Sequence, residues 1–223
     1  MQDLSSTIRR LALQQFKTAR GSHDWDHTLR VHRLCRKIGA KEKADMDVLS
    51  VSAYLHDIGR SAEDHAKGAV CHAEKGAHMA ETLIRHLPLS PAQKENVIHC
   101  IRTHRYRGNN IPETIEARVL FDADKIDAIG AIGVARAFLF AGEVGAKLHN
   151  PDAVIENTTA YSIDDTAYRE YKIKLSKIIN RIMTAEGKRI AQKRHDFMEL
   201  FFHQFLQEFE GKREHTHEHH RGE

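Results

Sequence analysis

The stretch YLHDIG, residues 54–59, ends the apolar run VLSVSAYL and decides how the rest of the chain is interpreted. It places an imidazole and a carboxylate, His56 and Asp57, where the surrounding pattern predicts the buried end of a helix. Burying a carboxylate costs several kcal/mol unless the group is paired or bound to a metal ion. The two polar side chains therefore indicate a site inside the protein.

The remaining sequence predicts an all-α fold, a helical bundle in a single compact domain. Hydrophobic residues make up 41% of the 223 residues, only four are proline, and the apolar positions recur with helical spacing. The expected helices cover about 4–19, 22–38, 45–58, 70–87, 90–104, 112–126, a further segment to 140, 165–184 and 187–210. Gly39 is expected to end the second helix. Residues 60–68 are expected to form a polar loop, and residues 142–164 a lid or a mobile loop.

Composition limits the domain organisation and the partners. We expect one domain over residues 1–211 and a disordered His-rich tail at 212–223. Three widely spaced cysteines without a CxxC pair predict buried free thiols. No apolar stretch is long enough to span a bilayer and no signal-peptide pattern occurs, which favours a cytoplasmic protein without a membrane partner. The net charge of +3 is spread along the chain and argues against a nucleic-acid partner, while the oligomeric state stays open.

Ligand-type side chains fall on the apolar faces of several expected helices. His27, for example, shares the buried stripe of its helix with Val31 and Ile38. The residues placed in this way are His27, His56, Asp57, His72, His104 and Asp124. One buried histidine is usually a hydrogen-bonded core residue, but buried carboxylates are rarer. It is difficult to provide a separate hydrogen-bond partner for each of two buried carboxylates and several buried imidazoles that come from different helices.

A shared divalent cation would satisfy these groups together. Neutral imidazole and carboxylate both favour such ions, and helical bundles build metal sites from side chains on facing helices. The pattern therefore predicts a metal centre in preference to a polar core that is satisfied by hydrogen bonds alone.

Five blocks of sequence, in this order, resemble the HD-domain superfamily of metal-dependent phosphohydrolases. They are HDWDHTLRV (23–31), YLHDIG (54–59), CHAEKGA (71–77), IRTH (101–104) and FDADKIDAIGAIGVARAF (121–138). The last block is the most specific, and the set is similar to the bacterial YedJ-like branch. The motif core covers about residues 20–140. The resemblance implies one HD domain over 1–211, with C-terminal helices at about 165–210.

The resemblance also implies the metal ligands, which are His27, His56, Asp57 and Asp124. Asp122 is the alternative in the DAD triplet, and Asp124 is preferred because it precedes Lys125, as the ligand does in related blocks. The ion would be divalent, with Mn, Fe, Co, Ni, Mg and Zn all open.

Further residues match positions around such a centre. His72 and His104 match histidines that hold a second metal in some branches, and would otherwise contact substrate phosphate. Asp127 is expected to orient a ligand. His23 and Asp24 are expected to orient a ligand or the attacking water, although Asp24 could instead cap the helix.

The activity implied is hydrolysis of a phosphate ester of a nucleotide or a similar small phosphorylated compound by a metal-activated water. Asp57 and Lys125 are the expected catalytic residues, with Lys125 beside the phosphoryl group and Arg60 as a further candidate cation. Whether the enzyme is a phosphomonoesterase or a phosphodiesterase stays open. The alternatives are a di-iron HD-type oxygenase, which would require O₂ and iron, and a non-catalytic metal- or ligand-binding HD sensor.

Overall fold

The computed structural model describes residues 4–15, 25–66, 69–105, 110–151, 155 and 157–212. Every regular element in these ranges is a helix, which confirms the all-α prediction. The helices are α1 (Leu4–Gln15), α2 (Trp25–Glu42), α3 (Met46–Leu55), α4 (Arg60–His65), α5 (His72–Ile84), α6 (Pro91–Thr103), α7 (Ile115–Asp127), α8 (Gly130–Glu143), α10 (Ala167–Ile173), the 3-10 helix η1 (Leu175–Arg181) and α11 (Ala185–Phe209).

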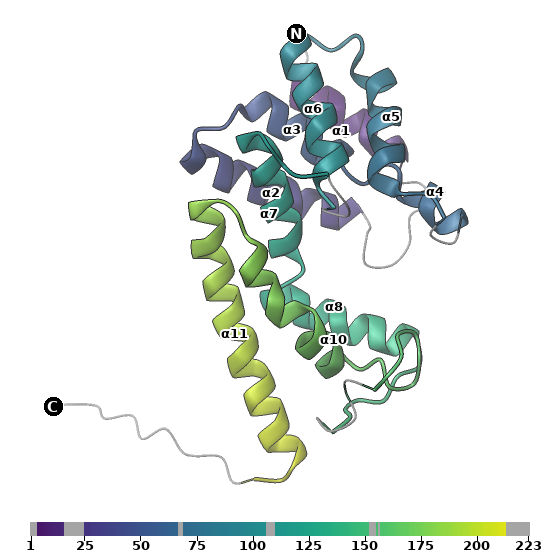
Figure 1. The fold of residues 1–223 in the computed structure, drawn as a ribbon, viewed down its shortest axis with the longest axis vertical. Coiled ribbons are helices and arrows are strands. Elements are labelled where there is room, and N and C mark those ends of the chain that lie inside the picture. Colours follow the sequence, from purple (N-terminus) through teal and green to yellow (C-terminus); the bar gives the residue numbers. More distant parts are fainter. Residues whose placement is uncertain are drawn as a thin grey trace, which may run out of the picture.

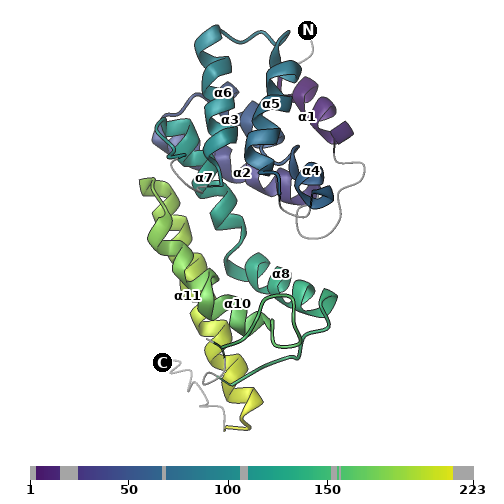
Figure 2. The same ribbon diagram turned by 45° about the vertical axis from the view of Figure 1, so that its right-hand side comes forward.

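The helices form two adjoining groups that share one core. Figure 1 shows α1 to α6 gathered at one end and α8, α10 and α11 at the other, with α7 reaching from the first group toward the second. Figure 2 shows the same grouping after a turn of 45°. Within the first group α2 packs against α3 and α7, and α5 packs against α6. A single cluster of buried side chains runs from Ile8 in α1 to Phe202 in α11, in agreement with a single domain.

Two carboxylates tie the start of α11 to the first group. Asp122 of α7 is fully buried and accepts hydrogen bonds from the backbone N–H groups of Met183 and Thr184, at 2.9 and 2.7 Å, and from the Thr184 hydroxyl at 2.6 Å. Glu42 of α2 accepts from the backbone N–H of Glu186 at 2.7 Å. Acceptors at a helix start satisfy N–H groups that have no partner inside the helix. Asp122 is therefore an anchor for α11.

Replacing Asp122 with Ala should lower the free energy of unfolding by about 3 kcal/mol, since buried donors at the start of α11 would lose their acceptor. Urea unfolding at neutral pH measures the change. The matched control is Asp196→Ala on the exposed side of α11, where the effect should stay within about 0.5 kcal/mol. Equal midpoints for the two variants would contradict the anchoring role.

The predicted helix stop at Gly39 is wrong. The helix α2 continues to Glu42, and the chain leaves it at Lys43, which has a positive φ of 57°. A Cβ atom on Gly39 would lie 2.2 Å from Cδ1 of Leu49 in α3. The glycine therefore admits the neighbouring helix and does not end its own.

Three further expectations are corrected. Residues 60–68 were expected to be a loop, but they contain α4, Arg60–His65. The helix expected at 165–184 is divided at Lys174, whose φ of −134° separates α10 from η1. The helix expected from Pro112 begins at Ile115, because the Thr114 side chain accepts from the backbone N–H of Ala117 and caps the helix there.

The described part of the long loop 142–164 is bonded to the start of α10. The Arg169 guanidinium donates to Asp165 at 2.7 Å and to the Thr158 hydroxyl at 2.5 Å. Asn150 donates to the carbonyl of Asp164 at 2.8 Å. This loop lies beside α8 and α10 (Figure 2), so its described residues are fixed to the second group of helices.

The cysteines are all free thiols, as predicted. Cys35 and Cys100 are buried, whereas Cys71 is partly exposed, so the expectation of burial is wrong for Cys71 alone. Among the described residues, no helix combines the length and the apolar character needed to cross a membrane. The His-rich tail predicted to be disordered lies outside the described residues, except for Lys212.

Candidate metal centre

Four imidazoles meet inside the first group of helices, in the spatial order His27, His56, His104 and His72. Neighbouring ring centroids are 5.4, 5.2 and 5.1 Å apart, and each of the four residues is at most 1% exposed. His27 lies in α2 and His72 opens α5, while His56 and His104 directly follow the last residues of α3 and α6. The fold thus brings together residues that are far apart in the sequence.

The two histidines at helix ends are oriented by their own helices. Nδ1 of His56 donates to the carbonyl of Ala53 at 2.8 Å, and Nδ1 of His104 donates to the carbonyl of Ile101 at 2.6 Å. Carbonyls in the last turn of a helix have no partner within the helix. Because a carbonyl only accepts, the ring hydrogen sits on Nδ1 in both residues and Nε2 presents a lone pair.

Carboxylates orient the other two histidines in the same way. Nδ1 of His27 donates to Asp127 at 2.8 Å, and Nδ1 of His72 donates to Glu63 at 2.7 Å. The Arg105 guanidinium also lies 3.0 Å from Nδ1 of His72, but a guanidinium only donates. The shorter contact with the carboxylate therefore assigns the ring hydrogen of His72 to Nδ1, and Nε2 of His72 faces the other rings with a lone pair.

Asp57 lies between the two pairs of imidazoles. Its Oδ2 atom is 3.7 Å from Nε2 of His27 and 3.7 Å from Nε2 of His56. Its Oδ1 atom is 3.4 Å from Nε2 of His72 and 3.6 Å from Nε2 of His104. One carboxylate, 2% exposed, thus presents a different oxygen to each pair.

Asp124 completes the first pair. Its Oδ1 atom is 3.4 Å from Nε2 of His27, and its Oδ2 atom accepts from Nζ of Lys125 at 2.7 Å. Asp122, the alternative considered from the sequence, is instead engaged with α11. The donor atoms form two groups in which all atoms lie within 4.8 Å of one another: His27, His56 and Asp124, and Asp57, His72 and His104.

Both groups fit a divalent cation. The Nε2 atoms of His72 and His104 face each other at 3.1 Å, and those of His27 and His56 at 3.3 Å. In the pair of His72 and His104 two lone pairs face each other at this distance and repel, and a cation between them would remove the repulsion. Nitrogen and carboxylate oxygen donors in threes suit divalent transition metals.

Burial determines the charge of the imidazoles, and hydrogen bonds modify it. Burial lowers the pKa of His56 to about 4 and that of His72 to about 3, so both are neutral at pH 7. Burial also acts to lower the pKa of His27, but hydrogen bonds to Asp124 and Asp127 outweigh it and raise that pKa to about 9. A cation at the first group would therefore compete with a proton on His27.

Asp127 supports His27 from behind. It is 1% exposed and also accepts from Arg30, at 2.8 and 3.0 Å, and from Arg136 at 3.1 Å. Burial acts to raise the pKa of Asp127, but the hydrogen bonds from His27 and Arg30 lower it to about 2. The carboxylate therefore stays ionised and holds the His27 ring in one orientation.

Sequence reasoning missed Glu63 and Arg105 as parts of this region. Glu63, in α4, is 8% exposed and accepts from His72, from Arg60 at 2.9 Å, and from Arg105. Arg60 also lies 3.4 Å from Oδ1 of Asp57. A helix at 60–65 places Arg60 and Glu63 one turn apart on the same side. Because a loop was expected at 60–68, this pair was not identified from the sequence.

Two expected residues lie outside the described ranges. His23 and Asp24, expected to orient a ligand or the attacking water, are not among the described residues. Trp25 stacks on Tyr54 with ring centroids 5.9 Å apart, at the edge of the core. Its ring is thus used in packing.

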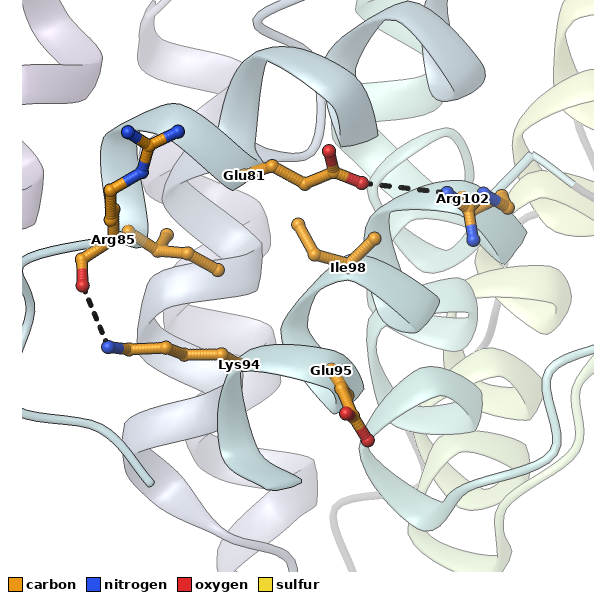
Figure 3. Close-up of a pocket in the computed structure, with 7 residues that line it drawn as sticks. Glu81, Arg85, Lys94, Glu95, Ile98 and Arg102 are labelled. Atoms are coloured by element: carbon orange, nitrogen blue, oxygen red, sulfur yellow. Dashed lines mark hydrogen bonds and ion pairs between the residues drawn. The ribbon is translucent and has the colours of Figure 1, made fainter. Parts of the chain in front are cut away.

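A separate pocket of about 550 Å³ opens between α5 and α6. Figure 3 shows Arg102 directed at Glu81, with an ion pair of 4.0 Å, and Lys94 donating to the carbonyl of Arg85 at 2.8 Å. The lining residues are Glu81, Ile84, Arg85, Lys94, Glu95, Ile98 and Arg102. This pocket shares no residue with either group of metal-type donors.

Gly59 sets the distance between the HDIG turn and α5. A Cβ atom there would lie 2.2 Å from the carbonyl oxygen of His72 and 2.6 Å from the backbone nitrogen of Gly76. Gly59→Ala should therefore destabilise the fold by about 3 kcal/mol, because backbone atoms would have to move apart. The control is Gly142→Ala in α8, where nothing lies within 4 Å and a gain of up to about 1 kcal/mol is expected. Comparable thermal unfolding of the two variants would contradict the close approach.

Comparisons of the sequence with known proteins identify the family of the chain. The model of the HD domain family matches residues 24–129, a range that contains both groups of donors. Protein YpgQ of Bacillus subtilis is 31% identical over 194 residues, which cover 85% of each chain. Ribonuclease Y of Chloroflexus aurantiacus is 30% identical over 119 residues, which cover 53% of this chain and 21% of that protein.

Comparison with solved structures identifies relatives of the same fold. The crystal structure of B. subtilis YpgQ in complex with ADP superposes with a TM-score of 0.70 at 27% identity and covers 92% of this chain and 94% of that one. An HD-superfamily hydrolase from Bacillus thuringiensis superposes with a TM-score of 0.72 at 26% identity and covers 94% and 97% of the two chains. By its sequence motif, its fold and its buried His–Asp cluster, the chain belongs to the HD-domain superfamily.

Proposed function

We propose that the protein is a metal-dependent phosphohydrolase with two adjacent metal sites, acting on a nucleotide or a similar small phosphorylated compound. The observation that carries this proposal is the position of Asp57, which presents one oxygen to each pair of imidazoles. One carboxylate between two sets of nitrogen donors is suited to a pair of divalent ions that act on a single phosphoryl group.

The ligands divide between the two sites. His27, His56 and Asp124 would hold the first ion, and His72 and His104 the second, with Asp57 contributing to both. In this proposal His72 and His104 are metal ligands and do not contact the substrate phosphate directly. The donor set alone leaves open which of Mn, Fe, Co, Ni, Mg or Zn is bound.

Bound divalent ions supply an acidified water and neutralise phosphoryl oxygens. Two cationic side chains of the protein, Lys125 and Arg60, lie next to these ligand groups. Lys125 donates to Asp124 at 2.7 Å and to the carbonyl of His104 at 3.4 Å, so its ammonium group lies beside both ligand groups. Arg60 lies beside Asp57. Phosphoryl transfer depends mainly on positioning and on charge stabilisation, so we assign both residues to the substrate phosphate, and Asp57 to a proton-handling role as well.

The choice of a nucleotide is supported by relatives. YpgQ of B. subtilis was crystallised in complex with ADP, and other structural neighbours are described as HD-superfamily hydrolases. Ribonuclease Y, which matches over the HD region, is named for an activity on phosphodiesters. The proposed reaction is therefore cleavage of a phosphate ester, by a monoesterase or a diesterase.

The test uses the full chain with His215, His217, His219 and His220 replaced by Gln, so that the His-rich tail does not bind metal. ADP and a panel of other nucleotides are incubated with protein loaded with Mn²⁺ and, in separate samples, with each of the other five metals, and the products are separated by ion-exchange chromatography. We expect turnover that stops on addition of EDTA and returns with Mn²⁺. Absence of hydrolysis with each of the six metals would refute the proposal, and O₂ consumption by iron-loaded protein would support the oxygenase instead.

A further inference from the structure

The two ligand groups are built on the same plan. Each contains one histidine at a helix end, whose Nδ1 donates to the carbonyl three residues earlier: His56 in the first group and His104 in the second. Each contains another histidine whose Nδ1 donates to a buried carboxylate: His27 to Asp127 and His72 to Glu63.

The plan extends to the groups around these carboxylates. Asp127 accepts from two arginines, Arg30 and Arg136. Glu63 also accepts from two arginines, Arg60 and Arg105. Arg30 lies in α2 and Arg136 in α8, whereas Arg60 lies in α4 and Arg105 lies just beyond the end of α6. The repetition is therefore spatial and does not appear as a repeat in the sequence.

From this correspondence we propose that Glu63 is the positioning residue of the second metal site, as Asp127 is of the first; the proposal rests on the two-site phosphohydrolase proposed above. Glu63 acts through His72 and does not itself bind the ion. Its carboxylate keeps the ring hydrogen on Nδ1, so that Nε2 is the free donor, and it fixes the rotation of the ring. Arg60 and Arg105 hold the carboxylate in place and balance its charge.

Glutamine at this position tests the charge and the tautomer with little change in shape. The amide can present either its oxygen or its NH₂ group to Nδ1 of His72. In the second arrangement the ring hydrogen would move to Nε2 and block the donor atom. Loss of an outer-shell partner of a ligating histidine typically weakens metal binding about 10- to 100-fold.

The experiment is calorimetric titration of Mn²⁺ into the full chain with the tail histidines replaced as above. Glu63→Gln should weaken one of two equivalents about 10- to 100-fold and leave the other unchanged. In a His56→Ala background, which retains the second group, Glu63→Gln should weaken the remaining equivalent, whereas Asp127→Asn should not. In a His104→Ala background the two effects should be reversed.

The matched control is Glu74→Gln in α5, an exposed carboxylate bonded to Arg102 at 3.2 Å and to Asn110 at 2.8 Å. It should leave both equivalents unchanged. Electron paramagnetic resonance of bound Mn²⁺ gives a second readout. Two ions that share Asp57 should show exchange coupling in the parent protein, and isolated-ion signals in Glu63→Gln at limiting Mn²⁺.

A merely structural role gives a different result. Glu63→Gln would then weaken both equivalents alike, and that outcome overturns the proposal, as does unchanged binding of both. If Glu63→Gln does not fold, Glu63→Asp, which keeps the charge but is shorter, should show the same selective loss to a smaller degree. Fewer than two equivalents in the parent protein would refute the two-site function itself, which separates that failure from a failure of the role of Glu63.

Discussion

Replacing Asp57 with Asn is expected to remove both metal equivalents and to lower turnover more than about 100-fold, beyond the loss typical for an outer-shell partner. The reason is that the two oxygens of this one carboxylate face different pairs of imidazoles, at 3.4 to 3.7 Å from their Nε2 atoms. Asparagine keeps the shape but has no charge and only one oxygen. Metal content after dialysis against Mn²⁺ and the rate of nucleotide hydrolysis are the two measurements.

The control for this variant is Asp47→Asn, an exposed acidic residue in the first turn of α3, the helix that precedes Asp57. It should leave metal content and turnover unchanged. Retention of one full equivalent in Asp57→Asn would mean that Asp57 serves a single site, and the shared-carboxylate arrangement would be wrong.

Replacing His72 with Ala should remove one equivalent, leave the other bound, and lower turnover by more than about 100-fold. The first group, His27, His56 and Asp124, contains no atom of His72 and keeps its donors. Turnover should nevertheless fall, because the phosphoryl group would lose one of two neutralising charges. Titration of Mn²⁺ against turnover in the same samples measures both effects.

The comparison variant is His78→Ala, an exposed histidine six residues further along α5. It should behave as the parent protein. If His72→Ala loses one equivalent yet keeps full turnover, then catalysis depends on the first ion alone, and the proposed action of two ions on one phosphoryl group would be wrong.

Helical periodicity alone placed the donors on buried faces. His27, His56 and Asp57 were identifiable because each interrupts an apolar stripe or ends one. Periodicity could also have separated Asp122 from Asp124, since residues two apart on a helix point about 200° apart. It could not say which of the two faces meets the histidines, because that depends on where α2 and α11 pack around α7. The resemblance to a family supplied the choice of Asp124.

Other parts of the site depend on tertiary contacts that cannot be predicted from local patterns in a single sequence. Glu63 and Arg105 lie 42 residues apart and meet only because α4 and the end of α6 converge on His72. Glycine is a common helix stop, but Gly39 lies within α2 and leaves space for the side chain of Leu49 of α3. Local signals are reliable where a helix provides its own capping partners. An example is α6, which begins with the capping box of Ser90 and Gln93.

The most direct test of the central claim is the number of metal ions per chain in the full-length protein whose tail histidines are replaced by Gln. Inductively coupled plasma mass spectrometry after equilibrium dialysis against Mn²⁺ gives this number. Two equivalents per chain are predicted, one for each group of donors. No bound metal, or a single equivalent at saturation, would contradict the proposal of a two-metal centre that shares Asp57.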